Sequence, residues 1–381
     1  MAWEEIAGQQ RVKNILQRAI KENRVANSYC FWGNDGVGKE AVAIEFAKTL
    51  NCLSPINNNG TLSACGKCDS CKQFVHFQHP NLIFIHSLPA GKATDSKSDS
   101  SFSKLSDEQI EEIQTQFRLK AQDYYHKIAI SNANQIKIGS IRELKKNLSM
   151  SAMQEGRRVI IVLRADELTK ESANSFLKTL EEPSEGVTII LITARQDQIL
   201  PTILSRCQQI HFQPLAQPEL EQLLIAKHNI TDADAKLFAC FAQGSYQSAL
   251  EFLNEDVKKL RKDSVELLRA TLKKNVFRFD LMSSIDKILN NKDKKKYIAV
   301  LLHILVWLRD ASTISLTGNI SHIVNIDQKD DLESFAKKFG KKDLSLAISL
   351  FEKAIVQVNK NVQNQLIFLN LFLKLREILL I

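Results

Sequence analysis

A glycine-rich loop that ends in a lysine is the first group of residues whose spacing indicates chemistry. It spans residues 33–40, with glycines at Gly33, Gly36 and Gly38 and the lysine at Lys39. The loop follows an apolar run and opens a helix-patterned segment. In that context backbone N–H groups curl around phosphate oxygens and the lysine supplies the countercharge. These four residues are therefore candidates for binding a nucleotide.

Two departures argue against hydrolysis at this loop. The position after the lysine, where a Ser or Thr hydroxyl would ligate Mg²⁺, is Glu40. An ATPase also needs carboxylates at the end of a neighbouring strand. The strand expected at 159–163 is followed directly by Arg164, and we expect the acidic residues Asp166 and Glu167 to point away from the sheet edge. We therefore expect no intrinsic ATPase activity, and we leave open whether ATP occupies the loop.

Four cysteines fall within twenty residues and have the spacing of a zinc site. Cys52 is followed after twelve residues by Cys65, Cys68 and Cys71. Four thiolates would complete a tetrahedral shell and leave no position for water, so this pattern predicts a structural rather than a catalytic Zn²⁺ site. Histidines at positions 76 and 79 could replace one thiolate, and free reduced thiols are the alternative.

A single arginine, Arg206, lies in the segment 202–207 between two expected strands. An arginine in a loop is usually a solvated surface charge. If this loop faced a nucleotide bound by another subunit, Arg206 could neutralise transition-state charge in trans, as an arginine finger does.

The elements that would position these residues are five apolar, β-branched runs alternating with helix-patterned segments. Nearly continuous apolar strands of this kind suit a parallel sheet buried on both faces. The expected strands cover residues 29–32, 82–85, 159–163, 188–192 and 209–212. After Pro214 and Pro218 every segment reads as helix. The Ser/Lys/Asp-rich stretch at 90–105 is expected to be a disordered loop.

Composition sets the outer limits. The chain has 381 residues, of which 44% are hydrophobic and 25% charged, with a net charge of +8 and a pI near 9.0. Packed cores are expected, and disorder of the whole chain is excluded. The net charge is compatible with a polyanionic partner without demanding one. No run reaches the ~20 uninterrupted apolar residues that a bilayer requires, so we expect a cytoplasmic protein without a membrane partner.

Several of these features occur together in one family. The segments 6–9 (Ile-Ala-Gly-Gln), 173–183 (ANSFLKTLEEP) and 205–207 (Ser-Arg-Cys), with the phosphate loop and the four-cysteine insertion, make the chain resemble bacterial clamp-loader subunits of the AAA+ class. The resemblance implies an α/β then all-α chain. It would have an AAA+ P-loop module at 1–213 with a five-stranded parallel sheet of order 5-1-4-3-2 and a zinc insertion at 51–72. A small helical lid at 214–255 and a helical collar for oligomerisation at 256–381 would follow.

Within that family the chain is more similar to the delta-prime subunits of DNA polymerase III than to the ATP-hydrolysing gamma/tau subunits. The family's hydroxyl after the lysine, its strand-end acidic pair and its lid arginine align with Glu40, 163–164 and Gln247. The sensing position on the fourth strand is kept at Thr193, and the trans-acting arginine matches Arg206.

The resemblance implies partners as well as a role. They are the gamma/tau and delta subunits and, through the assembly, the sliding clamp and primer–template DNA. The implied role is to complete a neighbour's ATP site during clamp loading in replication. Two alternatives stand beside it: an ATP-hydrolysing gamma/tau-type subunit, and a stand-alone zinc-containing DNA-binding protein.

Overall fold

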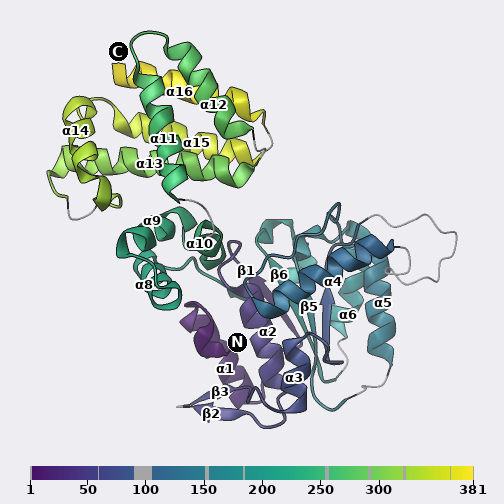
Figure 1. Ribbon diagram of the computed structural model, residues 1–381. Coiled ribbons are helices and arrows are strands. Elements are labelled where there is room, and N and C mark those ends of the chain that lie inside the picture. Colours follow the sequence, from purple (N-terminus) through teal and green to yellow (C-terminus); the bar gives the residue numbers. More distant parts are fainter. Residues whose placement is uncertain are drawn as a thin grey trace. The chain divides into compact units, whose positions relative to one another are not determined.

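A computed structural model describes residues 2–58, 60–89, 105–150, 154–182, 185–253, 257–290, 293–320, 323–360 and 362–380. The chain divides into two compact units (Figure 1). The first comprises Met1–Ala216 with Gly244–Gln247, and the second comprises Gln217–Gln243 with Ser248–Ile381. The predicted division into three parts stays a prediction. All but the last residue of the loop expected at 90–105 lies outside the described residues.

The first unit is built on a five-stranded parallel sheet. Its strands, in spatial order, are β4 (Leu82–Ile85), β5 (Arg158–Val162), β6 (Val187–Thr193), β1 (Ser28–Trp32) and β7 (Gln208–His211). The five strands expected from the sequence, numbered 1 to 5 in chain order, correspond to β1, β4, β5, β6 and β7. Read from the β7 edge, the sheet has the order 5-1-4-3-2 in that numbering, so the predicted topology is confirmed. A separate antiparallel pair, β2 (Ile56–Asn58) and β3 (Thr61–Ser63), was not predicted from the sequence.

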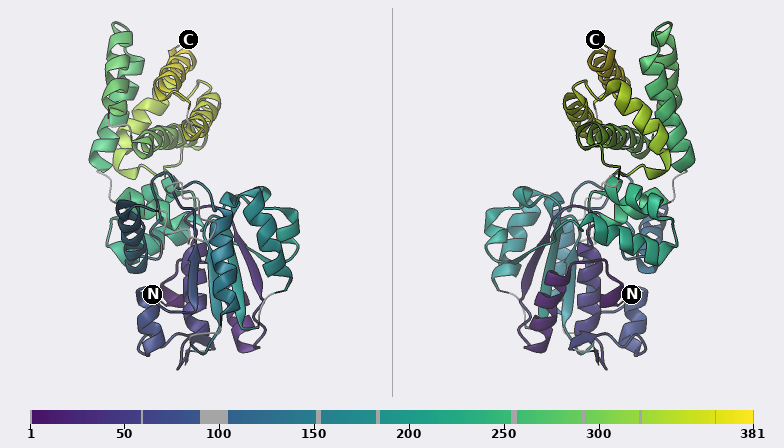
Figure 2. Two further views of the ribbon diagram at one scale, coloured as in Figure 1. Left: turned by 90° about the vertical axis from the view of Figure 1, so that its right-hand side faces the viewer. Right: turned by 90° about the vertical axis from the view of Figure 1, so that its left-hand side faces the viewer.

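Helices cover both faces of this sheet (Figure 2). Against one face pack α5 (Ile138–Ser149), α6 (Lys170–Glu181) and α7 (Pro201–Leu204). Beside the other face lie α1 (Gln10–Lys21), α2 (Lys39–Leu50), α3 (Asp69–Val75) and α4 (Asp107–Gln122). Short 3₁₀ turns occur at Trp3–Glu5, Ala165–Glu167 and Gln196–Gln198.

Burial on two faces explains why the strands carry almost unbroken apolar runs. In β1, Cys30 belongs to the core beneath α5–α7, whereas Tyr29 turns to the opposite face and meets Phe46 of α2 at 5.8 Å between ring centroids. Successive side chains of a strand point to opposite faces, so both sets must be apolar here.

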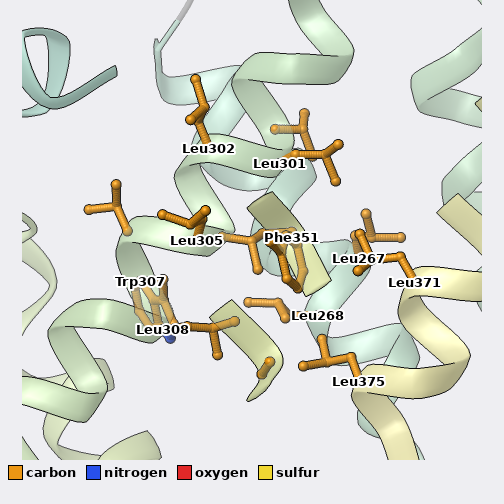
Figure 3. Close-up of a cluster of buried hydrophobic side chains, with 14 of the residues drawn as sticks. Leu267, Leu268, Leu301, Leu302, Leu305, Trp307, Leu308, Phe351, Leu371 and Leu375 are labelled. Atoms are coloured by element: carbon orange, nitrogen blue, oxygen red, sulfur yellow. The ribbon is translucent and has the colours of Figure 1, made fainter. Parts of the chain in front are cut away.

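The second unit is entirely helical in its described residues. Its helices are α8 (Gln217–His228), α9 (Asp232–Ala242), α10 (Tyr246–Leu253), α11 (Val257–Leu272), α12 (Phe277–Leu289), α13 (Lys294–Thr317), α14 (Lys329–Phe339), α15 (Leu344–Asn359) and α16 (Asn364–Leu380), with a 3₁₀ turn at Ile326–Gln328. The first two residues of α10, Tyr246 and Gln247, belong to the first unit. Phe351 and Trp307 lie in the core, surrounded by leucines of α11, α13 and α16 (Figure 3).

Helix α13 is long and apolar enough to cross a membrane by length and composition, although the sequence shows no uninterrupted apolar run of that length. Its most apolar window is 67% buried within the structure, where α13 forms the central helix of the core. Burial of this kind is what the core helix of a globular domain has.

Candidate functional site

The phosphate loop connects β1 to α2 and has a shape that requires its glycines. Gly33, Gly36 and Gly38 have φ angles of 141°, 75° and 100°, in the region that other residues rarely adopt. A Cβ on Gly33 would lie 2.2 Å from the Phe212 carbonyl oxygen, and one on Gly36 would lie 2.2 Å from the Ser245 hydroxyl. The glycines therefore serve both backbone conformation and close packing.

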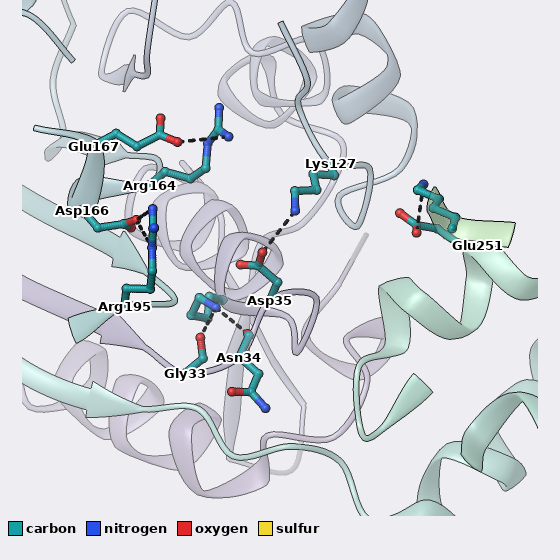
Figure 4. A network of polar contacts seen from close by, with 11 residues as sticks. Gly33, Asn34, Asp35, Lys127, Arg164, Asp166, Glu167, Arg195 and Glu251 are labelled. Carbon is teal, nitrogen blue, oxygen red and sulfur yellow. Dashed lines mark hydrogen bonds and ion pairs between the residues drawn. The ribbon is translucent and has the colours of Figure 1, made fainter. Parts of the chain in front are cut away.

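Lys39 is buried, and its ammonium group bonds to the loop itself. Its Nζ donates to the carbonyl oxygens of Gly33 and Asn34, each at 2.6 Å (Figure 4). Burial lowers the pKa of Lys39, while the nearby carboxylates of Asp35, Glu40 and Asp166 act in the opposite direction. The ammonium group that would contact a phosphate is therefore hydrogen-bonded to the backbone of its own loop.

The residue after Lys39 is held by an internal cation. The carboxylate of Glu40 forms an ion pair with Lys120 of α4, whose side chain is only 2% exposed. The Lys120 ammonium also donates to the carbonyl oxygens of Tyr124 and His126, at 2.5 and 2.8 Å. A lysine ammonium therefore stands beside the position where a phosphate loop would hold its metal ion. Sequence reasoning missed Lys120, because no local pattern connects residues 80 positions apart.

The segment after α4 closes the pocket further. Lys127 pairs with Asp35 at 3.1 Å, and the Tyr125 hydroxyl accepts a hydrogen bond from the Ala7 backbone at 2.8 Å. Burial alone would raise the pKa of Asp35, but Lys127, Lys39 and Arg164 together hold it below its ordinary value. The remaining cavity is about 50 Å³, far below the roughly 300–1,000 Å³ of small-molecule pockets.

The acidic pair after β5 lies differently from the prediction. Asp166 was expected to point away from the sheet edge, and this was wrong: its carboxylate accepts a hydrogen bond from the Thr193 hydroxyl, at the end of β6, at 2.7 Å. The physical reason is Arg164, whose left-handed backbone (φ 48°, ψ 58°) turns the chain back after the strand. The strand ends at Val162, one residue earlier than predicted, so Leu163 separates it from Arg164.

Both carboxylates of that pair already have partners in this chain. Asp166 is bonded by Arg195 at 2.5 and 2.9 Å, and its side chain is 4% exposed (Figure 4). Glu167 pairs with Arg164 at 3.2 Å and accepts a hydrogen bond from Ser87. Carboxylates that are neutralised in this way are poorly suited to hold Mg²⁺ or to orient a water.

Gln247, at the position of the family's lid arginine, lies directly over the phosphate loop. Its backbone N–H donates to the Gly36 carbonyl at 3.2 Å, and it lines the same cavity as Lys39 and Thr193. An amide at this position carries no charge with which to contact a γ-phosphate.

The four predicted cysteines meet at one point. The sulfur atoms of Cys52, Cys65, Cys68 and Cys71 all lie within 4.8 Å of one another. Three of the S–S distances are 3.6, 3.9 and 4.0 Å, too long for a disulfide of about 2.05 Å. Four sulfurs at about 2.3 Å from a tetrahedral zinc are roughly 3.8 Å apart, so the cluster has the size of a ZnS₄ site.

The surroundings of these sulfurs also suit a cation. Backbone N–H groups of Lys67 and Cys68 lower the pKa of Cys65 to about 6. Burial raises the pKa of Cys52 and of Cys71, so a bound metal would be needed to keep these two sulfurs as thiolates. The ring of His79 lies elsewhere, against Phe74 at 4.5 Å.

Arg206 lies at the surface of the first unit, just after α7. Its Nη1 donates to the Thr202 carbonyl at 2.8 Å, and its Nη2 pairs with Glu181, the last residue of α6, at 2.6 Å. The two side chains are 35% and 46% exposed. The guanidinium is therefore ion-paired within its own chain, but it is not buried.

With this geometry described, comparison with known proteins identifies the family. Residues 8–216 match the family described as "DNA polymerase III, delta subunit", which is more than half of the chain. The chain belongs to this family. Over 379 residues it is 24% identical to DNA polymerase III subunit delta' of Bacillus subtilis (strain 168), covering 99% of both chains.

Two further relatives match a smaller part of the chain, and one solved structure aligns along most of it. DNA polymerase III subunit delta' of Pseudomonas aeruginosa is 25% identical over 264 residues, 69% of this chain and 66% of that protein. DNA polymerase III subunit tau/gamma of Haemophilus influenzae is 28% identical over 258 residues, 66% of this chain but only 30% of that longer protein. A gamma-subunit-related protein of Thermotoga maritima aligns over 96% of this chain with a TM-score of 0.41 and 16% identity.

Proposed function

We propose that this chain is a delta-prime-type clamp-loader subunit that does not hydrolyse ATP and completes the ATP site of a neighbouring gamma/tau subunit with Arg206. Its other partners would be a delta subunit and, through the assembly, the sliding clamp and primer–template DNA. Membership of the delta-subunit family and the full-length similarity to a delta' subunit support this assignment.

One observation carries the absence of hydrolysis. The Glu40–Lys120 ion pair occupies the place where a hydroxyl would ligate Mg²⁺. A carboxylate paired with an ammonium is neither free to bind the metal nor easily displaced, because removing it would leave a buried charge unpaired. The same conclusion follows from Asp166 and Glu167, whose charges are already neutralised.

The trans role is supported by where Arg206 lies. It is on the surface, and its only ion pair that the structure records is with a half-exposed carboxylate. Exposed pairs of this kind are worth about 0.2–1 kcal/mol, so a triphosphate could attract the guanidinium away. A fixed positive charge placed at the transferring phosphoryl group acts most strongly in the transition state.

Assembly would use the helical unit. It has an open groove of about 690 Å³ between α12 and α16, lined by apolar side chains of Phe277, Leu281, Leu369, Leu373 and Leu380. Exposed apolar surface of this kind is typical of protein contacts, which supports a collar that joins subunits.

The zinc site would be structural in this scheme. The four sulfur atoms lie at the spacing of a closed ZnS₄ shell, which leaves no coordination position for a substrate. The ion would hold the segment between α2 and α3 in place.

The proposal is tested by replacing Arg206 in a loader reconstituted from all its subunits. For Arg206→Ala we expect single-turnover hydrolysis at the neighbouring site to fall by about 10²-fold or more, because an arginine finger stabilises transition-state charge. ATP binding, measured by filter binding, should weaken far less than hydrolysis slows, and assembly, measured by size-exclusion chromatography, should be unchanged. Arg18→Ala, which removes an exposed arginine of α1, is the matched control.

Unchanged hydrolysis in the Arg206→Ala loader would rule out the trans role. The gamma/tau alternative is separated by the chain alone, since a hydrolysing subunit would turn over ATP without partners. A stand-alone DNA-binding protein would shift primed DNA in a gel without partners, which the proposed subunit should not do.

A further inference from the structure

The ion pair between Arg206 and Glu181 joins two segments that are separated in the sequence. Glu181 is the last residue of α6, and Arg206 follows α7. The carboxylate accepts from Nη2 at 2.6 Å, while Nη1 is bonded to the Thr202 carbonyl at 2.8 Å. The guanidinium is thus held on two sides by its own subunit.

The ion pair between Arg206 and Glu181 is weak enough to open and close, so it can serve as a resting position for the arginine. Glu181 and Arg206 are 46% and 35% exposed, so water and salt compete with the pair. The C-terminal end of α6 also attracts a cation weakly, because helix carbonyls point toward it. Neither partner is buried, so breaking the pair leaves no charge stranded in the interior.

For the arginine to reach a neighbour's triphosphate, the pair with Glu181 has to open. A carboxylate that stayed beside the guanidinium would cancel much of its charge and would repel the phosphate oxygens. Glu181 and the phosphate therefore compete for the same group. Only the loaders whose arginine is released bind ATP at full strength, so the ion pair lowers the apparent affinity for ATP.

We propose that Glu181 is a positioning residue that holds Arg206 in a resting position until ATP in the neighbouring subunit displaces it. The inference rests on the proposed trans role of Arg206 and adds a competitor for it. Because the competition ends once the arginine has moved, Glu181 affects the KM for ATP and leaves kcat unchanged.

The test uses the reconstituted loader with Glu181→Gln, which keeps size and polarity but removes the charge. We expect the KM for ATP at the neighbouring site to fall by about two- to fivefold, the weight of an exposed ion pair, with kcat unchanged. Glu181→Asp should keep the wild-type KM. Glu182→Gln, a change at the next, exposed residue, is the matched control and should have no effect.

A double variant shows whether Glu181 acts through Arg206. In the Arg206→Ala background, Glu181→Gln should leave the KM where Arg206→Ala alone puts it. An unchanged KM in Glu181→Gln, a fall in kcat, or the same change of KM without Arg206 would each overturn the inference. If Arg206→Ala itself had no effect on hydrolysis, the proposed function would fail first. If Arg206→Ala slows hydrolysis and Glu181→Gln does nothing, only the role of Glu181 is wrong.

Discussion

Replacing Cys68 by Ser is expected to abolish zinc binding and to unfold the segment from Cys52 to Val75. Structural zinc sites are worth roughly 10 kcal/mol or more to peptides that depend on them, and the described residues of this segment form only short elements, β2, β3 and α3. We expect about one zinc per wild-type chain by atomic absorption. For Cys68→Ser we expect almost none, together with loss of amide protection across the segment in hydrogen exchange.

Cys240→Ser is the matched control, because Cys240 is a half-buried thiol of the helical unit. It should keep one zinc per chain. A wild-type chain that holds no zinc after purification with the metal, or a Cys68→Ser variant that keeps it, would contradict the assignment of the four cysteines.

Replacing Glu40 by Gln is expected to destabilise the first unit by about 3 kcal/mol. This is the lower end of the range for removing one partner of a buried ion pair, since Glu40 is 28% exposed whereas Lys120 is 2% exposed. The loss arises because the Lys120 ammonium stays in the interior without its carboxylate. Adding Lys120→Met to Glu40→Gln should restore part of the stability, because no unpaired charge then remains.

Tryptophan fluorescence during urea denaturation measures this effect in the right unit. In a Trp307→Phe background, the remaining tryptophans, Trp3 and Trp32, both report on the first unit. Glu22→Gln breaks an exposed pair with Arg18 and should cost less than about 1 kcal/mol. A double variant less stable than Glu40→Gln alone would mean that Lys120 is held by its carbonyl contacts and not by Glu40.

Much of the fold could be predicted from the sequence, for a physical reason. Strands buried on both faces must be apolar at every position, so runs such as 159–163 are visible in one dimension. The glycines at Gly33, Gly36 and Gly38 are visible for a similar reason, because their backbone angles exclude other residues. The cysteine spacing likewise follows from the geometry of one ion.

The features that could not be predicted from the sequence depend on contacts between distant residues, which leave no local pattern. Lys120 meets Glu40 only because α4 and the residues just after it lie beside the phosphate loop. The orientation of Asp166 depends on the left-handed backbone of Arg164. Because this residue is neither a glycine nor an asparagine, the sequence does not indicate a left-handed conformation there. The pairing of Arg206 with Glu181 depends on where α6 and α7 end in space.

The most direct test of the central claim is ATP turnover by the purified chain alone, compared with Lys39→Ala. If the phosphate loop is closed by Lys120, Lys127 and Gln247 as the contacts indicate, Mg·ATP should be hydrolysed no faster with either protein than in buffer without protein. Turnover by the wild-type chain that disappears in Lys39→Ala would contradict the account, because it would place hydrolysis in this subunit's own pocket.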